Sequence, residues 1–145
     1  MNDVKVRMAK REDLPSVTSL LQSATLPILG VAEHFDTFLV AQGDNGIVGA
    51  IGLEVYGPTA LLRSAVVAEQ ERGRGIGQLL YNELLREARE LQIQRLILLT
   101  NTAEEYFRRK GFRKIDQQTV TGPITASAEF SGACPVHAAC MELLP

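Results

Sequence analysis

The 145-residue sequence has no tryptophan, only two cysteines and an aromatic content of 6%. Two cysteines are too few for a disulfide-stabilised scaffold, and we expect both to be reduced. No apolar run is long enough to cross a bilayer, and the first residues lack the basic-then-apolar pattern of a signal peptide. We therefore expect a cytoplasmic protein that is not inserted in a membrane.

An excess of charge of one sign is also missing. Lys and Arg total 15 against 17 Asp and Glu, which gives a net charge of −2 at pH 7. Without excess positive charge, the chain has no overall field that would attract nucleic acid or anionic lipid. We expect neither nucleic acid nor a membrane as a partner.

The apolar fraction of 46% and the charged fraction of 22% are typical of a globular protein. The length suits one domain spanning residues 1–145, and no Pro/Gly/Ser-rich linker or internal repeat divides it. The oligomeric state stays open at this point, with a homodimer as one alternative.

Hydropathy patterns predict strands that alternate with helices. The expected strands are 4–8, 38–42, 47–55, 60–67, 95–100 and 139–144, with a hairpin turn at 44–46. A first amphipathic helix is expected to be capped by Asp13, with Pro15 at its start, and to run through Ala24. Further helices are expected over 76–91, and up to Gly111 after a capping box of Thr102 and Glu105. The long helix should bury Ile76, Leu79, Leu80, Leu84, Ala88 and Leu91. Two parallel strands would flank this helix, and strand 60–67 should be central in the sheet of an α/β fold.

A glycine-rich segment joins the expected central strand to the long helix. It reads Arg72, Gly73, Arg74, Gly75, Ile76, Gly77. The glycines permit left-handed backbone and let a ligand approach the main chain, and the helix adds its positive N-terminal end. Together with the two arginines, the segment predicts an anion-binding site, with a diphosphate as the expected ligand.

Two other phosphate-binding patterns do not fit this segment. The Lys and the hydroxyl residue that a P-loop requires are absent around Gly77. A dinucleotide fingerprint lies in the first strand–helix turn, whereas Gly73, Gly75 and Gly77 are evenly spaced and follow several expected strands. A solvated turn that binds no ligand is the remaining alternative.

The spacing Arg-x-x-Gly-x-Gly, between a buried strand and a long amphipathic helix, resembles the motif of the GCN5-related N-acetyltransferases (GNAT). The resemblance runs from about Val4 to Phe112 and implies a mixed, mostly antiparallel sheet of about six to seven strands with about four helices. It also implies acetyl-CoA as co-substrate and no metal. In that family the loop holds the pyrophosphate and the preceding strand pairs with the pantetheine arm. This implies cofactor contacts from Val66, Val67 and the whole glycine-rich segment.

Residues 61–67, 100–112 and 128–141 are similar to a narrower group, the acetyltransferases associated with arsenic-resistance operons. They are more remotely similar to the acetyltransferase module of N-acetylglutamate synthases. The likeness implies a small primary amine as acceptor, an amino acid or an arsenical of that type, acetylated by direct attack in a ternary complex. A catalytically idle acyl-CoA-binding module and a protein or peptide N-acetyltransferase remain alternatives.

Three residues of the central strands are candidates for the acceptor site. Glu54 follows small residues on one strand face, where space is expected, and is a candidate base or ligand of the acceptor's ammonium group; a solvated strand end is the alternative. Arg63 lies in the most apolar strand and needs a carboxylate partner, either Glu54 or the acceptor. Ser64 is a further substrate-binding candidate. Backbone N–H groups near Val66 and Val67 should polarise the thioester carbonyl.

The sequence departs from the family pattern at Phe107. Many members carry a Tyr there, which protonates the departing thiolate. Adjacent helical residues point about 100° apart, so Tyr106 is a catalytic candidate only with a local shift, and otherwise packs or contacts substrate. Phe107 is assigned to cofactor contact. Asn101 is assigned to CoA contact or to the helix cap.

The tail carries Cys134, His137 and Cys140, which are ligands that suit a soft metal or a trivalent arsenical. No second ligand cluster completes a zinc site, so we expect no metal and a packing role, with metalloid binding as the alternative. For His34 two alternatives stay open: its side chain lines the acceptor cavity, or it is exposed to solvent. By resemblance, residues 26–35 and 117–137 should shape acceptor specificity.

Overall fold

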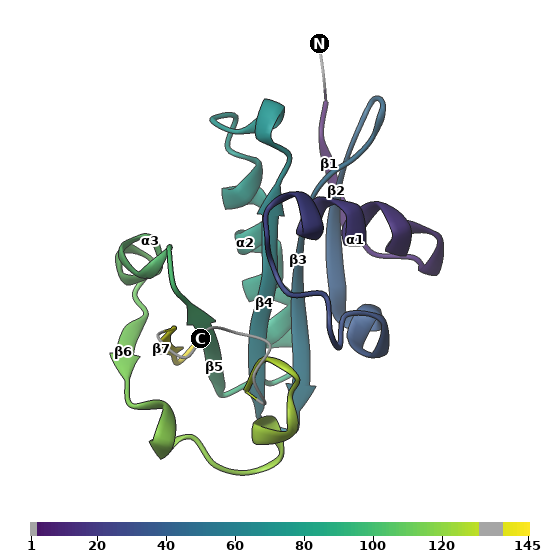
Figure 1. Ribbon diagram of the computed structural model, residues 1–145. Coiled ribbons are helices and arrows are strands. Elements are labelled where there is room, and N and C mark those ends of the chain that lie inside the picture. Colours follow the sequence, from purple (N-terminus) through teal and green to yellow (C-terminus); the bar gives the residue numbers. More distant parts are fainter. Residues whose placement is uncertain (1–2, 131–137) are drawn as a thin grey trace.

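In the computed structural model, which describes residues 3–130 and 138–145, a seven-stranded sheet runs in the order β1-β2-β3-β4-β5-β7-β6 (Figure 1). The strands are β1 (Lys5–Met8), β2 (Phe38–Gly43), β3 (Gly46–Tyr56), β4 (Thr59–Val67), β5 (Arg95–Thr100), β6 (Arg113–Ile115) and β7 (Ala139–Leu143). Neighbouring strands are antiparallel except for the β4–β5 pair. The predicted mixed sheet, with strand 60–67 at its centre, is confirmed.

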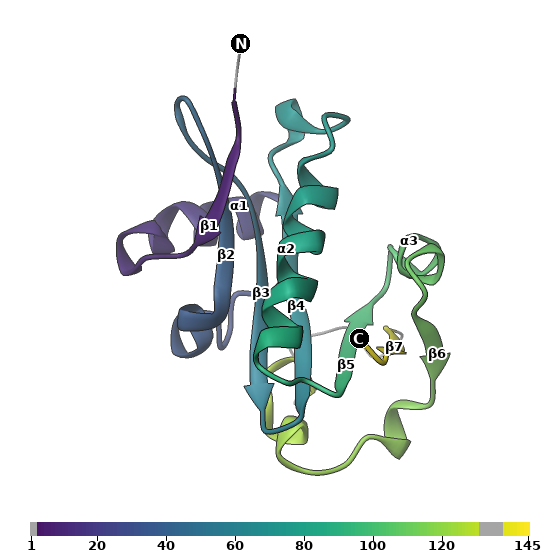
Figure 2. The same ribbon diagram turned by 180° about the vertical axis from the view of Figure 1, so that it is seen from behind.

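Helices cover both faces of this sheet. The α-helices are α1 (Leu14–Ser23), α2 (Ile76–Glu90) and α3 (Glu104–Arg109), and short 3₁₀ turns lie between the strands. α1 packs on one face and α2 on the other, as opposite views show (Figures 1 and 2). In the described part of the chain, no helix is long and apolar enough to span a bilayer.

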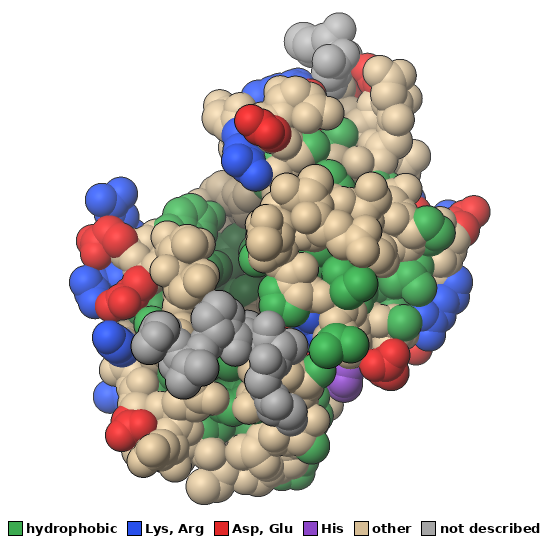
Figure 3. Space-filling view, in the orientation of Figure 1, with side chains coloured by type: hydrophobic (Ala, Val, Ile, Leu, Met, Phe, Trp, Pro, Cys, Tyr) green, Lys and Arg blue, Asp and Glu red, His purple; other side chains and the backbone are tan. Residues whose placement is uncertain are grey.

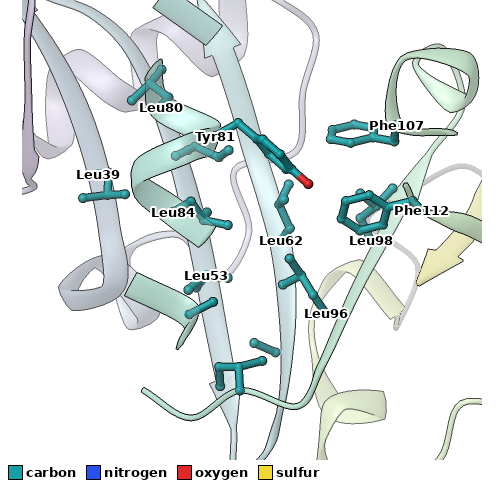
Figure 4. Close-up of a cluster of buried hydrophobic side chains, with 14 of the residues drawn as sticks. Leu39, Leu53, Leu62, Leu80, Tyr81, Leu84, Leu96, Leu98, Phe107 and Phe112 are labelled. Atoms are coloured by element: carbon teal, nitrogen blue, oxygen red, sulfur yellow. The ribbon is translucent and has the colours of Figure 1, made fainter. Parts of the chain in front are cut away.

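The face of α2 that meets the sheet differs from the prediction. Ile76, Leu80, Leu84 and Ala88 are buried as expected. Leu79 and Leu91 are 46% and 41% exposed, so their assignment to the core is wrong, and Tyr81 is buried in their place. The buried stripe is therefore rotated toward Tyr81, whose ring joins the leucine core (Figure 4).

A β-bulge interrupts the pairing of β3 with β4. Ala50 pairs with Val66 and Gly52 with Arg63, so β4 carries one more residue than β3 between these pairs. Ser64 takes a left-handed φ of 61° to form this bulge. Ala65 is thereby exposed in the middle of a buried strand.

The space expected above Gly52 of β3 is filled by the core. A methyl group on Gly52 would lie 2.3 Å from ring carbon Cζ of Phe38. Phe38 is fully buried in the cluster beneath α1, together with Val17, Leu21 and Phe35. The expectation of open space is therefore wrong at Gly52, the small residue next to Glu54 on this face, because it accommodates an aromatic ring rather than a ligand.

β4 and β5 are paired at one end only. Thr59, Ala60 and Leu61 lie opposite Arg95, Leu96 and Ile97. Beyond these pairs the two strands diverge, and the ribbon shows them splayed toward α3 (Figure 1). The second half of β4 therefore has an edge that faces an opening in the sheet.

The capping predicted for α3 is wrong. Ala103 is the N-cap residue and makes no side-chain cap hydrogen bond, while its backbone N–H donates to Thr100 Oγ1 at 3.0 Å. Glu105 instead pairs with arginines farther along its own helix. Neither Thr102 nor Asn101 caps this helix, because the preceding strand residue supplies the hydroxyl.

Asp13 stands at the N-cap position of α1, but its side chain makes no cap hydrogen bond to this helix. Its carboxylate accepts from the backbone N–H of Lys10 at 2.7 Å and pairs with Arg7 at 2.8 Å. The hydrogen bond from Arg7 lowers the pKa of the Asp13 carboxyl against the effect of burial. Asp13 therefore closes the short turn before α1 and ties it to β1.

Candidate functional site

Two adjoining cavities occupy the opening between β4 and β5. The first has a volume of about 400 Å³, lies between β4, α2 and α3, and is lined mostly by apolar groups. Its lining residues from β4 onward are Ala65, Val66, Val67, Arg72, Gly77, Leu80, Tyr81, Thr102, Ala103, Tyr106 and Phe107. The surface is hollowed on this face of the molecule, between α1 and α3 (Figure 3).

The second cavity, of about 610 Å³, lies on the side of the loop that follows α1, and its lining is more polar. Its polar side chains are Gln22, Thr25, Arg63, Ser64, Thr100, Asn101, Thr102 and Glu129. Glu129 is the one acidic side chain among the described residues that line it. This cavity suits a small polar molecule with an amino group.

The two cavities share part of their walls. Leu26, Ala65, Thr102, Ala103 and Phe107 line both of them. A ligand in one cavity would therefore contact a ligand in the other at the β4 bulge. This arrangement suits the transfer of a group between two bound molecules.

The glycine-rich loop enters the first cavity at the N-terminus of α2. Gly73 and Gly75 have φ values of 82° and 79°, in the left-handed region, and no neighbouring atom lies within 4 Å of a methyl group placed on either. The conformation, rather than crowding, requires glycine at both positions. The first N–H groups of α2 follow directly and have no acceptor inside the helix. The loop thus has the form of the predicted anion site.

Side chains of the loop fix its position. Arg72 Nε donates to the backbone O of Val67 at 3.2 Å, and Arg74 pairs with Glu71 at 2.5 Å. Gly77 lines the first cavity, where a methyl group would lie 3.8 Å from Val67 Cγ2 and 4.0 Å from Tyr106 Oη. Arg72 and Gly77 therefore connect the loop to the cavity wall, whereas Gly73, Arg74, Gly75 and Ile76 are not among its lining residues.

A buried ion cluster lies behind the second cavity. Arg63 Nη1 is 2.7 Å from Glu54 Oε2, and both side chains are fully buried. Arg63 Nε is 3.4 Å from Glu129 Oε2, and Tyr56 donates a hydrogen bond to Glu54. The carboxylate partner predicted for Arg63 is therefore Glu54. We call these four residues, with His34, the Arg63 cluster.

Glu54 lines neither cavity. Burial alone would raise the pKa of its carboxyl, but hydrogen bonds from Tyr56, Arg63 and Ser127 outweigh this effect and lower the pKa below its usual range. His34 Nε2 lies 3.7 Å from Glu54 Oε1 and so belongs to this cluster rather than to a cavity wall. The cluster holds Glu54 ionised at neutral pH.

Arg63 also ties the loop after α1 to the sheet. Nη1 donates to the backbone O of Leu29 at 2.7 Å, and Nη2 donates to the backbone O of Pro27 at 3.1 Å. Ser64 Oγ accepts from Arg63 Nε at 3.1 Å. Gly30, with a φ of 86°, lets the loop approach, because a methyl group there would lie 3.1 Å from Arg63 Nη1. Most of the guanidinium is therefore used within the chain.

The candidate residues between the end of β5 and α3 lie at different cavities. Phe107 is buried and lines both cavities, whereas Asn101 is exposed and lines only the second cavity. Tyr106 lines the first cavity and is 42% exposed, with its ring 5.1 Å from that of Phe107. Burial raises the pKa of Tyr106. Phe107 and Tyr106 lie beside the first cavity, whereas Asn101 lies beside the second only.

Several lining residues were given no site role from the sequence, and Tyr81 and Glu129 are the two that matter most for the chemistry. Tyr81 projects from α2 into the first cavity, and Glu129 lies in the second. A hydroxyl within the apolar stripe of α2 was a usable signal for Tyr81. Glu129 lies in the segment 128–141 of the narrower resemblance, but that segment has no periodicity, and only its three-dimensional neighbour Arg63 reveals its place.

The structure describes only one of the three candidate soft-metal ligands of the tail. Cys134 and His137 lie outside the described residues. Cys140 is buried in β7, and burial raises the pKa of its thiol to about 11. Within residues 3–130 and 138–145, no group of three or more His, Cys, Asp or Glu side chains is arranged to hold a metal ion.

Comparisons with known proteins agree with this geometry. The family model described as "Acetyltransferase (GNAT) domain" matches residues 34–114, which include the loop and both strands of the opening. An amino-acid acetyltransferase of Mycobacterium tuberculosis is 30% identical over 135 residues, covering 82% of this chain and 74% of the relative.

Solved structures share the fold. The crystal structure of Mycobacterium tuberculosis Rv2747, in complex with CoA, superposes with a TM-score of 0.81 at 26% identity, covering 97% of this chain and 99% of that one. An N-acetylglutamate synthase from Neisseria gonorrhoeae, complexed with CoA and N-acetyl-glutamate, gives a TM-score of 0.82 at 19% identity, with 98% of this chain matching 35% of that one. The family match, the relative and the shared fold agree, and the chain belongs to the GNAT acetyltransferase family.

Proposed function

We propose that this protein transfers an acetyl group from acetyl-CoA to the primary amine of a small molecule, an amino acid or a compound of similar shape and charge. The observation that carries this proposal is the pair of cavities that meet at Ala65 and Phe107. One cavity is apolar and opens at an anion-binding loop, and the other is polar and contains a carboxylate. These are the requirements of an acyl-CoA donor and an amine acceptor.

The first cavity and the loop fit CoA. Arg72 and the main-chain N–H groups of Gly73 to Gly77 would hold the diphosphate, because helix N-termini and left-handed turns favour anions. Val66 and Val67 line the cavity at the free edge of β4, where an extended amide-containing arm can add as a strand would. CoA supplies the activated acetyl thioester when bound.

The second cavity fits an amino acid. The Glu129 carboxylate would bind and orient the amino group, and Ser64, Asn101 and Thr100 offer further hydrogen bonds. Arg63 reaches the same wall, but its bonds to Glu54, Pro27 and Leu29 favour a supporting role over direct capture of the acceptor's carboxylate. We assign Glu54 a positioning role, in which it holds Arg63 and through it the loop after α1.

Direct attack is the reaction this geometry favours. With both ligands present, the amine nitrogen would meet the thioester carbonyl at the bulge, where backbone N–H groups near Val66 can polarise the carbonyl oxygen. Phe107 excludes water from the meeting point of the two cavities. No covalent enzyme intermediate is needed in such a ternary complex.

The test is acetyl-CoA-dependent release of free thiol across a panel of amines. The panel contains amino acids, amino-acid-like arsenicals and phosphinates, polyamines and short peptides, and the signal is corrected for the two protein cysteines. Turnover of amino acids or amino-acid-like arsenicals supports the proposal and separates the arsenical acceptor from ordinary amino acids. Turnover of peptides alone would make the protein a peptide N-acetyltransferase.

A binding measurement completes this test. Isothermal titration with CoA separates an enzyme whose acceptor is missing from the panel from a chain that binds no acyl-CoA. Tight CoA binding without turnover on any amine would favour a catalytically idle acyl-CoA-binding module. Absence of CoA binding would overturn the proposed function itself.

A further inference from the structure

Tyr81 carries a buried hydroxyl with no internal partner. Within the described part of the chain, Tyr81 Oη is the one buried side-chain oxygen or nitrogen atom that has no hydrogen-bond partner. The residue is 4% exposed and lies in α2, between Leu80 and the next turn at Leu84. The close-up shows its oxygen directed away from α2 toward the neighbouring rings of Phe107 and Phe112 (Figure 4).

An unpaired hydroxyl in this position is unfavourable in the free protein. A buried hydroxyl without a partner loses its hydration and gains no hydrogen bond in return. Phenylalanine would fill the same space and leave no polar atom unsatisfied. The hydroxyl therefore has a use only when something that accepts a hydrogen bond enters the site.

The cavity shows where that acceptor must lie. Tyr81 lines the first cavity and not the second, and its oxygen points toward the packed rings of Phe112 and Phe107, of which Phe107 lines both cavities. The ligand atom that Tyr81 can reach is therefore near the meeting point of the two cavities. In the proposed function, that end of the first cavity receives the sulfur and the acetyl group of the donor.

We propose that the Tyr81 hydroxyl donates a hydrogen bond to the CoA sulfur as the thiolate departs. This inference rests on the proposed function. The amine nitrogen forms a bond to the acetyl carbon, the carbon–sulfur bond breaks, and its electron pair passes to sulfur. Tyr81 keeps its proton throughout, and the proton lost by the amine goes to solvent. Tyr81 thus stabilises the developing charge on sulfur from the side of α2.

The surroundings of Tyr81 keep it a donor at every working pH. Burial, helped by the nearby Tyr106 and opposed by Arg89, raises the pKa of Tyr81 to about 12. The cation of Lys110 lies 5.3 Å from the Tyr81 ring centroid and 5.2 Å from that of Tyr106. The hydroxyl remains protonated over the range in which amine acceptors become neutral. Titration of Tyr81 should therefore not contribute to the pH dependence of kcat.

The position of Tyr106 is different. Its hydroxyl lies near Gly77, at the N-terminal end of α2, and its side chain is 42% exposed. Water can satisfy this hydroxyl in the free protein. Tyr106→Phe therefore removes the second tyrosine hydroxyl of the same cavity and serves as the matched comparison for Tyr81→Phe.

The primary experiment needs no acceptor. CoA is bound to the wild-type protein, to Tyr81→Phe and to Tyr106→Phe, and thiolate formation is followed by ultraviolet absorbance as pH rises, with desulfo-CoA complexes as blanks for the protein's own thiols and phenols. A hydrogen bond to the thiolate lowers the pKa of the bound thiol. We expect that pKa to be about one pH unit higher in Tyr81→Phe than in wild type, a tenfold change in ionisation. Tyr106→Phe should keep the wild-type value.

Kinetics and stability provide two further readouts. With the acceptor found in the panel, Tyr81→Phe should lower kcat about 10- to 100-fold, as expected for loss of a hydrogen bond to a charged group, and leave the KM for acetyl-CoA within about twofold. Because the hydroxyl has no partner in the free protein, the melting temperature should be unchanged or higher. A merely structural tyrosine would give the opposite pattern.

The outcomes separate this inference from the proposed function. If CoA binds all three proteins and its thiol has the same pKa in each complex, the role of Tyr81 is overturned and the acetyltransferase proposal still stands. A raised thiol pKa in Tyr106→Phe but not in Tyr81→Phe would move the role to Tyr106. If no variant and no wild-type protein binds CoA, both proposals fail together.

Discussion

The walls of the two cavities are built in different ways. The first cavity is lined mostly by apolar groups, and the buried Tyr81 hydroxyl on its wall is left for a ligand. The second cavity is supported by the Arg63 cluster, in which buried charges are paired with one another. A site for an invariant donor is thus prepared by unpaired groups, whereas the wall beside the acceptor is stabilised by satisfied ones.

The difference has an energetic basis. Buried charges that lack partners are strongly unfavourable, so a charged wall is stable before the acceptor arrives only when its charges neutralise each other. Backbone N–H groups and a phenol hydroxyl carry only partial charge. The free-energy cost of leaving them without a hydrogen-bond partner until a ligand binds is therefore smaller. Changes to the Arg63 cluster should therefore affect folding first, and changes to the first cavity should affect binding first.

The largest expected effect comes from Arg63→Met. Removal of the guanidinium leaves Glu54 buried without its cation and releases the carbonyls of Pro27 and Leu29, so we expect the free energy of unfolding to fall by about 3–5 kcal/mol at pH 7. Glu54→Gln should cost less, because Arg63 keeps Glu129. Urea unfolding of both variants measures the difference. A loss for Glu54→Gln as large as that for Arg63→Met would contradict this ranking.

The next effect concerns the first cavity. Gly77→Leu should raise the Kd for CoA at least about 100-fold, since the new side chain occupies the cavity between Val67 and Tyr106, while folding is preserved because leucine favours a helix more than glycine does. Isothermal titration and thermal melts test both statements. The matched control, Asn82→Leu, places the same side chain on the exposed face of α2 and should leave CoA affinity unchanged.

A smaller effect is expected at the acceptor. Glu129→Gln removes the carboxylate of the second cavity and should raise the acceptor KM about tenfold, with the KM for acetyl-CoA unchanged. Glu142→Gln is the control, because Glu142 is also a buried carboxylate paired with arginines but lines neither cavity. Equal rises in both KM values would show that Glu129 supports the fold rather than the acceptor.

The smallest effect is a difference in acid sensitivity. The pKa of Glu54 is lowered in the folded protein, so its contribution to stability is present above the unfolded pKa of about 4.3 and is lost as pH falls through the folded pKa. Glu54→Gln should therefore lose stability less steeply than wild type below about pH 4.5, by up to about 1.4 kcal/mol per pH unit. Urea unfolding between pH 7 and pH 3 gives both slopes. Parallel curves would mean that Glu54 has the same pKa in both states.

The first cavity was the more predictable of the two from sequence. Its loop is a contiguous motif, and the left-handed glycines at 73 and 75 follow from local backbone requirements. The strands were found because alternation and apolar runs are local signals, and the family was identified from the same segment. β6 was missed, since three residues are too short for a periodic pattern.

The second cavity depends on contacts between distant residues. Nothing in the sequence around Gly52 indicates that Phe38 fills the space above it, and nothing near Arg63 indicates hydrogen bonds to Pro27 and Leu29.

The buried stripe of α2 was predicted with Leu79 instead of Tyr81, because hydropathy favours leucine and the exact rotation of the helix is set by the sheet. Arg63 was correctly expected to need a carboxylate, since the penalty for an unpaired buried charge is a property of the residue itself.

The attachment of the loop after α1 has a consequence for how acceptor preference can change. Arg63 holds this loop by the backbone oxygens of Pro27 and Leu29, and main-chain oxygens are the same whatever side chains the loop carries. The side chains of Ile28 and Leu29 are 37% and 65% exposed and take no part in that attachment. Substitutions at Ile28, which lines the second cavity, can therefore accumulate, by drift or by design, and change the shape of that cavity without loss of the native fold.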